Sequence, residues 1–439
     1  MTPQAELPHP GFLPKLGRDA WLVNGSLMVF AAAFLGITQL LRVIYLLRLG
    51  AGLELIGLLY GIGALLFGVL GLPSGMLGER VGARRAMLLG AVALVLGLCL
   101  LPLTELLTGP VRSVWPIVPE LVNTLGWSLL VVNSVPILVA TTAPEDRKTA
   151  YALREALLGF AVLSGTLLAG VLPATFAFLL GTTTATPVPY RFGLLASVVL
   201  SFGGLLLLTR TGSLHYERHT RTASSVSAPW RPIVLLLICG FLNQGAVASC
   251  RAFTYAYMDT AFGLPTSAIG LISATGMALA VGAALYSSRL ARRFGSGRAM
   301  ALASVALALD LLMMALIPYW IAAAVGTIIV LALFSLWMPA YQTLQMEFAA
   351  PGQRAMVSGA GFMALGLGFG VTSLIGGRLA ATTGYPALFL LGVVLALSSA
   401  GLMMYVHALR VRQDAITDHP QEQPIGRPTA MTLEPETHP

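Results

Sequence analysis

Long apolar runs alternate with short polar turns along almost the whole chain. Each run is close to or longer than the roughly 20 residues with which a helix crosses a hydrocarbon core of about 30 Å. Twelve runs are present, at residues 21–47, 52–74, 86–107, 114–141, 152–173, 191–209, 232–257, 265–287, 299–317, 319–346, 355–376 and 385–409. The pattern predicts an all-α polytopic membrane protein with 12 transmembrane helices.

The composition agrees with this pattern. Only 10% of the 439 residues are charged, whereas a soluble protein carries about a quarter. The mean hydropathy is +0.82. The first run is too long for a secretory signal peptide and no small-residue cleavage site follows it, so it is counted as a span. The polar, Pro-rich ends of the chain, 1–20 and 410–439, are expected to be disordered tails.

The net charge of +8 follows the expected membrane topology. With both termini placed in the cytoplasm, 20 of the 26 Lys and Arg residues fall in cytoplasmic segments, as the positive-inside rule requires. The remaining six are Arg42, Arg48, Arg112, Arg191, Arg251 and Arg378. The basic charge therefore indicates orientation in the cell (inner or plasma) membrane, and no nucleic-acid partner is expected.

The chain offers no sequence signal for a cofactor or a metal. Its three cysteines, Cys99, Cys239 and Cys250, lie inside predicted spans, which argues against a disulfide framework. No histidine lies centrally in a span, so a histidine metal site is not expected. A P-loop and a catalytic constellation are also missing from the sequence, which argues against an ATP-driven pump and against an enzyme.

The chain contains an internal repeat, which indicates two pseudo-symmetric halves. Three segment pairs correspond: "GERVGARRAML" from Gly78 with "ARRFGSGRAMA" from Ala291 (291 − 78 = 213), "PEDR" ending at Arg147 with "PGQR" ending at Arg354 (354 − 147 = 207), and "GITQLLR" ending at Arg42 with "GAVASCR" ending at Arg251 (251 − 42 = 209). The repeat predicts two six-helix bundles, 21–209 and 230–409, joined by a cytoplasmic linker at 210–229.

The polar segment "GMLGERVGARRAML" (75–88) is similar to a known family signature. It resembles the loop between helices 2 and 3 of the major facilitator superfamily, Gly-x-Leu-Ala-Asp-Arg-x-Gly-Arg-Arg. Glu79 stands where the signature has aspartate, and the final arginines come one residue late. The matching residues are Gly75, Leu77, Arg80, Gly82, Arg84 and Arg85. The resemblance spans nearly the whole chain and implies the two-bundle fold of secondary transporters.

The resemblance also implies that this loop is a cytoplasmic gate. Glu79 would reach the start of helix 11 near Arg354 when the cytoplasmic side is closed. The second copy of the loop has Arg292 at the position of Glu79. In the C-terminal half the candidate for the acid of the gate is therefore Glu347. The alternative is that these charges only set the topology. The residues assigned to the gate motif are Gly75, Glu79, Arg80, Gly82, Arg84, Arg85, Arg147, Arg293, Gly295, Arg298, Glu347 and Arg354.

In this fold helices 1, 4, 7 and 10 are implied to line a central cavity. Their polar and aromatic residues are the candidates for substrate contact: Gln39, Arg42, Asn123, Trp127, Asn243, Gln244, Arg251, Trp337, Tyr341 and Gln345. Ionisable groups within spans are costly and usually face a cavity or a partner. The candidates for ion coupling are Glu120, Asp259 and Asp310, of which Asp310 lies deepest in its span.

Arg42 and Arg251 occupy equivalent positions of the two halves and allow two interpretations. They could bind an anionic substrate, as a comparable arginine pair does in the organophosphate/phosphate antiporters of this superfamily. They lie about two helical turns closer to the outer face than that comparison places them. The alternative is a gate or structural role, in which Arg42 pairs with Glu120 and Arg251 pairs with Asp259.

The sequence therefore predicts a monomeric secondary transporter of a small organic solute, with a proton-coupled exporter as the first choice. Helices 4 and 5 lack the arginine and the Gly-Pro-x-x-Gly-Gly step typical of drug/proton exporters. The first alternative is an organic-anion uptake or exchange carrier that uses Arg42 and Arg251. An alternative from another class is a transport-inactive membrane sensor or scaffold, although the tails are short for a sensor domain.

Overall fold

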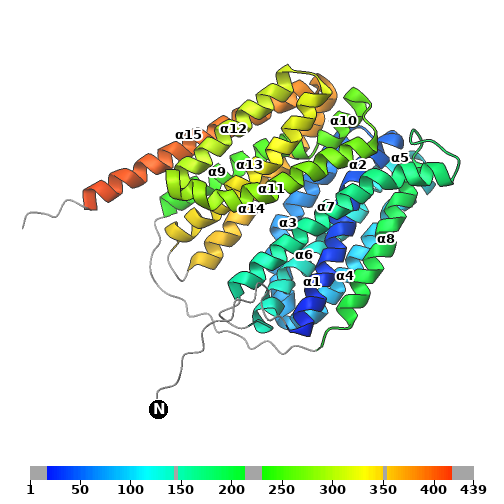
Figure 1. Ribbon diagram of the computed structural model, residues 1–439, viewed down its shortest axis with the longest axis horizontal. Coiled ribbons are helices and arrows are strands. Elements are labelled where there is room, and N and C mark those ends of the chain that lie inside the picture. Colours follow the sequence, from blue (N-terminus) through cyan, green and yellow to red (C-terminus); the bar gives the residue numbers. More distant parts are fainter. Residues whose placement is uncertain (1–16, 143–146, 213–229, 350–352, 418–439) are drawn as a thin grey trace, which may run out of the picture.

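The computed structural model describes residues 17–142, 147–212, 230–349 and 353–417. Within these residues, twelve helical segments are long and apolar enough to cross a membrane. Their positions agree with the twelve predicted spans. The described chain folds as an all-α membrane protein, and the helices come in two sets that lie side by side (Figure 1).

The first set forms the N-terminal half. Its first span is made of three consecutive segments, because a π-helical stretch interrupts the α-helix. The elements are α1 (Arg18–Ala31), η1 (Ala32–Thr38), α2 (Gln39–Arg48), α3 (Leu53–Val81), α4 (Ala83–Leu100), the 3₁₀ extension η2 (Leu101–Leu106), α5 (Gly109–Val114), α6 (Ile117–Ala140), α7 (Arg147–Leu179) and α8 (Val188–Thr209).

The second set forms the C-terminal half. Its first span is also interrupted, here between α9 and α10. The elements are α9 (Trp230–Arg251), α10 (Thr254–Phe262), α11 (Thr266–Phe294), α12 (Ser296–Leu316), α13 (Trp320–Phe348), α14 (Arg354–Thr383) and α15 (Tyr385–Thr417). Helix α15 continues to Thr417, eight positions past the predicted end of the last span at 409 (417 − 409).

The sequence repeat is visible in the turns of the two halves. Gly82 and Gly295 have φ angles of 94° and 79°, and each directly precedes the helix that follows the repeated loop. Gly50 and Gly263 have φ angles of 84° and 62° after the first span of each half. Both pairs are 213 positions apart (295 − 82 and 263 − 50). Only glycine adopts such φ values without strain, so the repeat preserves two turns.

The two halves are joined mainly at one end, which we call the closed end. There Gly57 of α3 lies against Gly377 of α14, so that an added Cβ would come within 2.8 Å of the Gly377 Cα. Gly170 of α7 meets Gly270 of α11 in the same way, at 3.3 Å. Such small-residue contacts let helix backbones approach closely.

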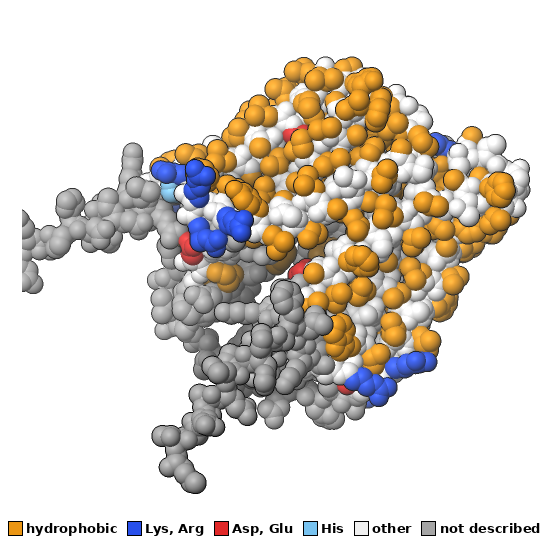
Figure 2. All heavy atoms as spheres, viewed as in Figure 1, with side chains coloured by type: hydrophobic (Ala, Val, Ile, Leu, Met, Phe, Trp, Pro, Cys, Tyr) orange, Lys and Arg blue, Asp and Glu red, His pale blue; other side chains and the backbone are white. Residues whose placement is uncertain are grey.

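The opposite end, which we call the open end, holds the Gly82 and Gly295 turns. An added Cβ at Gly71 of α3 or at Gly359 of α14 would find no described atom within 4 Å. Contacts between these two helices therefore weaken along their length. Figure 2 shows hydrophobic side chains over most of the viewed face of both halves, with Lys and Arg gathered toward the helix ends. This distribution suits a lipid-facing surface.

Candidate functional site

A cavity of about 400 Å³ lies between the two halves. The predicted spans 1, 4, 7 and 10 contribute to its wall, and spans 2, 5, 8 and 11 contribute as well. Phe34, Phe67, Trp127 and Phe369 give the wall an aromatic lining. Ligand sites are typically concave and mostly apolar, with a few polar groups that fix orientation. The cavity has this character.

Both spans that begin a half lose regular α-helical geometry beside the cavity. The π-helical η1 ends directly before Gln39, and the Thr38 hydroxyl donates to the Ala33 carbonyl, 2.8 Å away. In the second half, α9 ends at Arg251 and α10 begins at Thr254. π-Helical turns occur frequently at functional sites. In transporters, interrupted helices commonly form the binding site.

Arg42 forms a buried ion pair with Glu120, as one of the two sequence interpretations predicted. The side chains are only 4% and 6% exposed. Arg42 also donates to the Gln39 side-chain carbonyl at 3.0 Å, and its guanidinium lies 4.9 Å from the centre of the Tyr60 ring. Glu120, Gln39 and Tyr60 line the cavity, whereas Arg42 lies behind them. The pair compensates both charges.

Arg251 lines the cavity directly and has different surroundings. Within the described part of the chain no hydrogen bond or ion pair engages its guanidinium, which lies 5.6 Å from the centre of the Phe334 ring. Nearby, the Thr254 and Thr327 hydroxyls are hydrogen bonded to each other at 2.6 Å, which links α10 to α13. Arg251 is partly exposed and faces the cavity as a cation with no acidic partner among the described residues.

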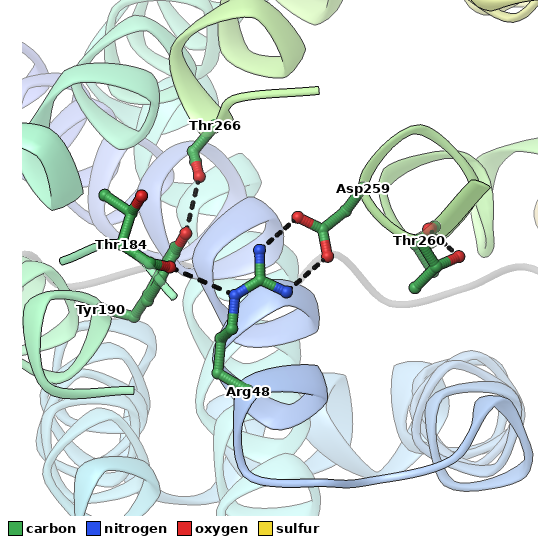
Figure 3. A network of polar contacts seen from close by, with 7 residues as sticks. Arg48, Thr184, Tyr190, Asp259, Thr260 and Thr266 are labelled. Carbon is green, nitrogen blue, oxygen red and sulfur yellow. Dashed lines mark hydrogen bonds and ion pairs between the residues drawn. The ribbon is translucent and has the colours of Figure 1, made fainter. Parts of the chain in front are cut away.

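The predicted pairing of Arg251 with Asp259 is wrong. Asp259 accepts two hydrogen bonds from Arg48 of the other half, at 2.7 and 2.6 Å (Figure 3). Arg251 ends α9, whereas Asp259 lies on α10 at the closed end, eight positions later (259 − 251), which is about two helical turns. Arg48 also donates to the Thr184 carbonyl at 3.2 Å. We call the Arg48–Asp259 pair the closed-end latch.

A neutral contact accompanies the closed-end latch. The Tyr190 and Thr266 hydroxyls are hydrogen bonded across the two halves at 3.0 Å, and the Arg48 guanidinium lies 5.9 Å from the centre of the Tyr190 ring (Figure 3). Asp259 is 3% exposed and Arg48 is 26% exposed. The bidentate geometry and the burial of Asp259 make this the main polar connection between the halves among the described residues.

Asp310 of α12 is buried, as its position in the sequence suggested. Neither carboxyl oxygen has a hydrogen-bond partner within the described residues. Gly326 of α13 packs beside it, so that an added Cβ would lie 3.5 Å from Oδ1. The residue does not belong to the cavity wall. Asp310 lies within the C-terminal half, and its role in coupling stays a prediction.

Helix periodicity explains which predicted cavity residues reach the wall. On α6 the wall residues are Glu120, Thr124 and Trp127, at spacings of four and three, which place them on one helix face. Asn123 was predicted in place of Thr124, but it is buried against Gly97 of α4. Gln39, Trp127 and Arg251 do line the cavity. Their contact with substrate stays a prediction.

The other predicted cavity residues pack between helices and do not line the described cavity. Asn243 accepts a hydrogen bond from the Ser304 hydroxyl at 2.9 Å, and Gln244, its neighbour on α9, is also outside the wall. On α13 the wall residues Thr327 and Leu331 lie in the first half of the helix, whereas Trp337, Tyr341 and Gln345 lie further along it toward Phe348. Trp337 stacks on Tyr341 at 4.6 Å, Tyr341 packs against Gly240 of α9, and Gln345 packs against Gly361 of α14.

The predicted gate motif lies at the open end. Arg84 donates to the Thr209 carbonyl and to the Thr211 hydroxyl, both at 3.0 Å, and so fastens the α3–α4 turn to the end of α8. Glu79 is exposed, and no ion pair engages it within the described residues. The remaining exposed motif arginines are Arg80, Arg85, Arg293 and Arg298, while Gly75 lies on α3 beside Val132.

Part of the predicted gate lies outside the described side chains. The structure gives the backbone of Arg147 and Arg354 at the starts of α7 and α14, but their side chains are not described. Glu347 is exposed near the end of α13. Whether Glu79 or Glu347 engages Arg354 stays a prediction.

Two groups of site residues were missed in the sequence. Arg48 was noted only as an outer-side charge. The sequence did contain a signal for it: Arg48 and Asp259 carry opposite charges and stand at nearly equivalent positions of the repeat, 211 apart (259 − 48). Tyr60, Thr124 and Thr327 were missed because a single polar residue on an apolar helix gives no sign of the face that meets the cavity.

Comparisons with known proteins agree with this architecture. The chain matches the model of the Major Facilitator Superfamily over residues 20–371. A bacterial homologue of the human lysosomal transporter Spinster, in an inward-facing and occupied conformation, is 13% identical with a TM-score of 0.69, covering 90% of this chain and 98% of that chain. No curated protein matches the sequence significantly.

Two further solved structures share the fold. The nucleoside transporter NupG is 13% identical with a TM-score of 0.67, covering 89% of this chain and 100% of that chain. The transporter FucP, in its outward conformation, is 15% identical with a TM-score of 0.55, covering 88% and 98%. At these identities the likeness concerns the fold alone.

Proposed function

The chain belongs to the major facilitator superfamily, and from this premise we propose that it moves a small organic solute by proton-coupled alternating access. Members of this family are secondary transporters, so the chain is a multi-pass membrane transporter with a small-molecule substrate. The proposal places it in the inner or plasma membrane as a monomer with both termini cytoplasmic, acting as an exporter rather than as an enzyme.

The observation that carries the proposal is the cavity between two halves that are held together at one end. The latch and the Gly57–Gly377 contact lie at the closed end. The positive-inside distribution supports a cytoplasmic orientation of the open end. In the proposed cycle this arrangement is the state whose cavity communicates with the cytoplasm. Rocking one half against the other would expose the same cavity to the outside.

The cavity acid supports the proton as the coupling ion. Glu120 belongs to the wall and compensates Arg42. A proton bound by Glu120 would remove that compensation, so proton binding would change the charge presented to the solute. Glu120→Gln is therefore expected to abolish dependence on a pH gradient while equilibrium exchange in proteoliposomes persists. Full gradient-driven transport by this variant would exclude Glu120, and Asp259 and Asp310 would be tested next.

A membrane sensor or scaffold of the same fold would not need alternating access, and labelling tests this difference. Leu331 lines the cavity, so Leu331→Cys would be placed in a background without Cys99, Cys239 and Cys250. The native cysteines must be removed because Cys250 also belongs to the wall. A membrane-impermeant thiol reagent is then added to sealed right-side-out or inverted vesicles.

We expect position 331 to react from both sides of the membrane, because each side has access in one of the two states. Ser201→Cys serves as the control: Ser201 is fully buried outside the cavity and should react from neither side. Reaction of Leu331→Cys from the cytoplasmic side alone would contradict alternating access and favour the sensor or scaffold.

A second candidate within transport is the organic-anion carrier predicted from Arg42 and Arg251. Arg251, which has no ion pair within the described residues, favours it, whereas the Arg42–Glu120 pair removes one of the two cations on which the prediction was based. The charge of the cavity therefore determines which solutes fit.

A further inference from the structure

The charged groups of the cavity wall do not balance. Glu120 is the one acid and Arg251 the one base among the wall residues described. Glu120 is already engaged by Arg42, which lies directly behind the wall. Asp310 lies outside the wall and makes no ion pair with Arg251 within the described residues. Arg42 and Glu120 together contribute no net charge. The site therefore carries one net positive charge, which comes from Arg251.

The sequence repeat explains why Arg251 has no acidic partner in the part of the chain that the structure describes. The offset of 207 positions between the halves, measured at the Arg147 and Arg354 landmarks, carries Glu120 to Thr327 (120 + 207). The same offset carries Trp127 to Phe334, over whose ring Arg251 lies. The second half therefore keeps the arginine and the aromatic ring of the first, but a threonine replaces the acid.

The rest of the cavity is suited to an apolar body. The Phe34 and Trp127 rings lie 5.9 Å apart on one side, and Phe369 lies 6.4 Å from Tyr60 on another. Met277 and Leu331 add further apolar side chains to the wall. Flat aromatic surfaces of this kind favour rings and planar groups. A volume of about 400 Å³ is within the range of small-molecule sites.

From these observations we infer that the substrate is an organic monoanion with an aromatic or other apolar body. Its anionic group would accept charge-assisted hydrogen bonds from the planar Arg251 guanidinium. Its body would lie against Trp127 and Phe34. The inference rests on the proposed transport function, since it assigns the solute class of the same cavity. A single uncompensated cation matches one negative charge better than two.

The test is equilibrium binding to the purified full-length protein by isothermal titration calorimetry. The probes share one ring system and differ in charge: 2-naphthoate, neutral 2-naphthamide, cationic 2-naphthylmethylammonium and dianionic 2-naphthyl phosphate. We expect 2-naphthoate to bind roughly tenfold or more tightly than the amide, because charge-assisted hydrogen bonds are strong. The phosphate should bind less tightly than 2-naphthoate, and the ammonium most weakly.

Three variants connect this preference to its cause. Arg251→Gln should abolish the preference for 2-naphthoate over the amide. Thr327→Glu should abolish it as well, because it supplies the acid that the first half has at Glu120 and leaves Arg251 in place. The control, Arg191→Gln, removes an arginine that pairs with Glu105 outside the cavity wall and should retain the preference.

Equal binding of 2-naphthoate and 2-naphthamide by the wild type would overturn the inference, as would a failure of 2-naphthoate to bind at millimolar concentration. An undiminished preference in Arg251→Gln would overturn it too. If Arg251→Gln does not fold, Thr327→Glu and the wild-type series still decide. Two-sided labelling of Leu331→Cys together with no anion preference would reject this substrate class alone and leave the transporter intact.

Discussion

Single side chains decide how two equivalent helices come to have different chemistry. Arg42 and Arg251 stand at matching positions, yet Glu120 compensates only the first. The sequence indicated both arginines and the Glu120 partner, because ionisable residues are rare in spans. It could not assign Asp259, because the partner of a side chain depends on how two halves far apart in sequence meet.

The closed-end latch gives the prediction at this scale. Arg48→Ala leaves the buried Asp259 carboxylate without its bidentate donor, so the state joined at the closed end should lose about 1.5–3 kcal/mol. That loss changes a two-state ratio by roughly tenfold or more. Spin labels on α2 and α10 should report a longer distance across the closed end.

The reversed pair, Arg48→Asp with Asp259→Arg, is the control for the latch, because it keeps both charges and exchanges their sides. We expect it to recover most of the short distance. An unchanged distance in Arg48→Ala would show that the helix contacts alone hold the closed end.

At the scale of whole elements, the bilayer explains why the spans were predictable. Each span has to be apolar over about 30 Å, and this requirement produces a continuous run of apolar residues that is visible in the sequence. The π-helical η1 was not predictable, because it accompanies a contact with another helix. Gly36 lies so close to α7 that an added Cβ would come within 2.6 Å of the Gly165 Cα. The break after Arg251 was likewise not predictable, because no glycine or proline stands at that point of the sequence.

The contact between α3 and α14 gives the element-scale prediction. An added Cβ at Gly57 would clash with the α14 backbone, at 2.8 Å from the Gly377 Cα. Gly57→Ala should push the two helices apart and favour opening of the closed end. Gly71→Ala is the matched control on the same helix, because its Cβ would have no described neighbour within 4 Å.

The measurement for both glycine variants is thiol labelling of a cysteine introduced at the closed end of α14. Faster labelling is expected in Gly57→Ala and an unchanged rate in Gly71→Ala. Equal rates in the two variants would show that α3 and α14 can separate slightly without changing the state of the molecule.

For the whole molecule, the repeat predicted the fold but not its conformation. Two halves of similar sequence predict two similar bundles, and the preserved positive-φ turns at Gly82 and Gly295 bear this out. A transporter populates at least two arrangements of small free-energy difference, and one sequence encodes both. Which end is joined follows from contacts between halves, such as Arg48–Asp259, that no local pattern reveals.

The opposite end of the molecule carries the last prediction, which concerns Glu79. This acid is exposed here, as expected if it engages α14 only when the open end closes. The N-terminus of a helix favours a carboxylate, so Glu79→Gln should destabilise that other state and leave the present one intact. A cysteine at the open-end mouth should then be labelled more completely from the side of the membrane that the open end faces. Glu54→Gln, the same substitution at the closed end of the same helix, is the control and should leave labelling unchanged.

Because Arg48→Ala and Glu79→Gln act on opposite ends, they should shift the molecule in opposite directions. A shift in the same direction, or unchanged labelling in Glu79→Gln, would reduce the motif to a topological signal.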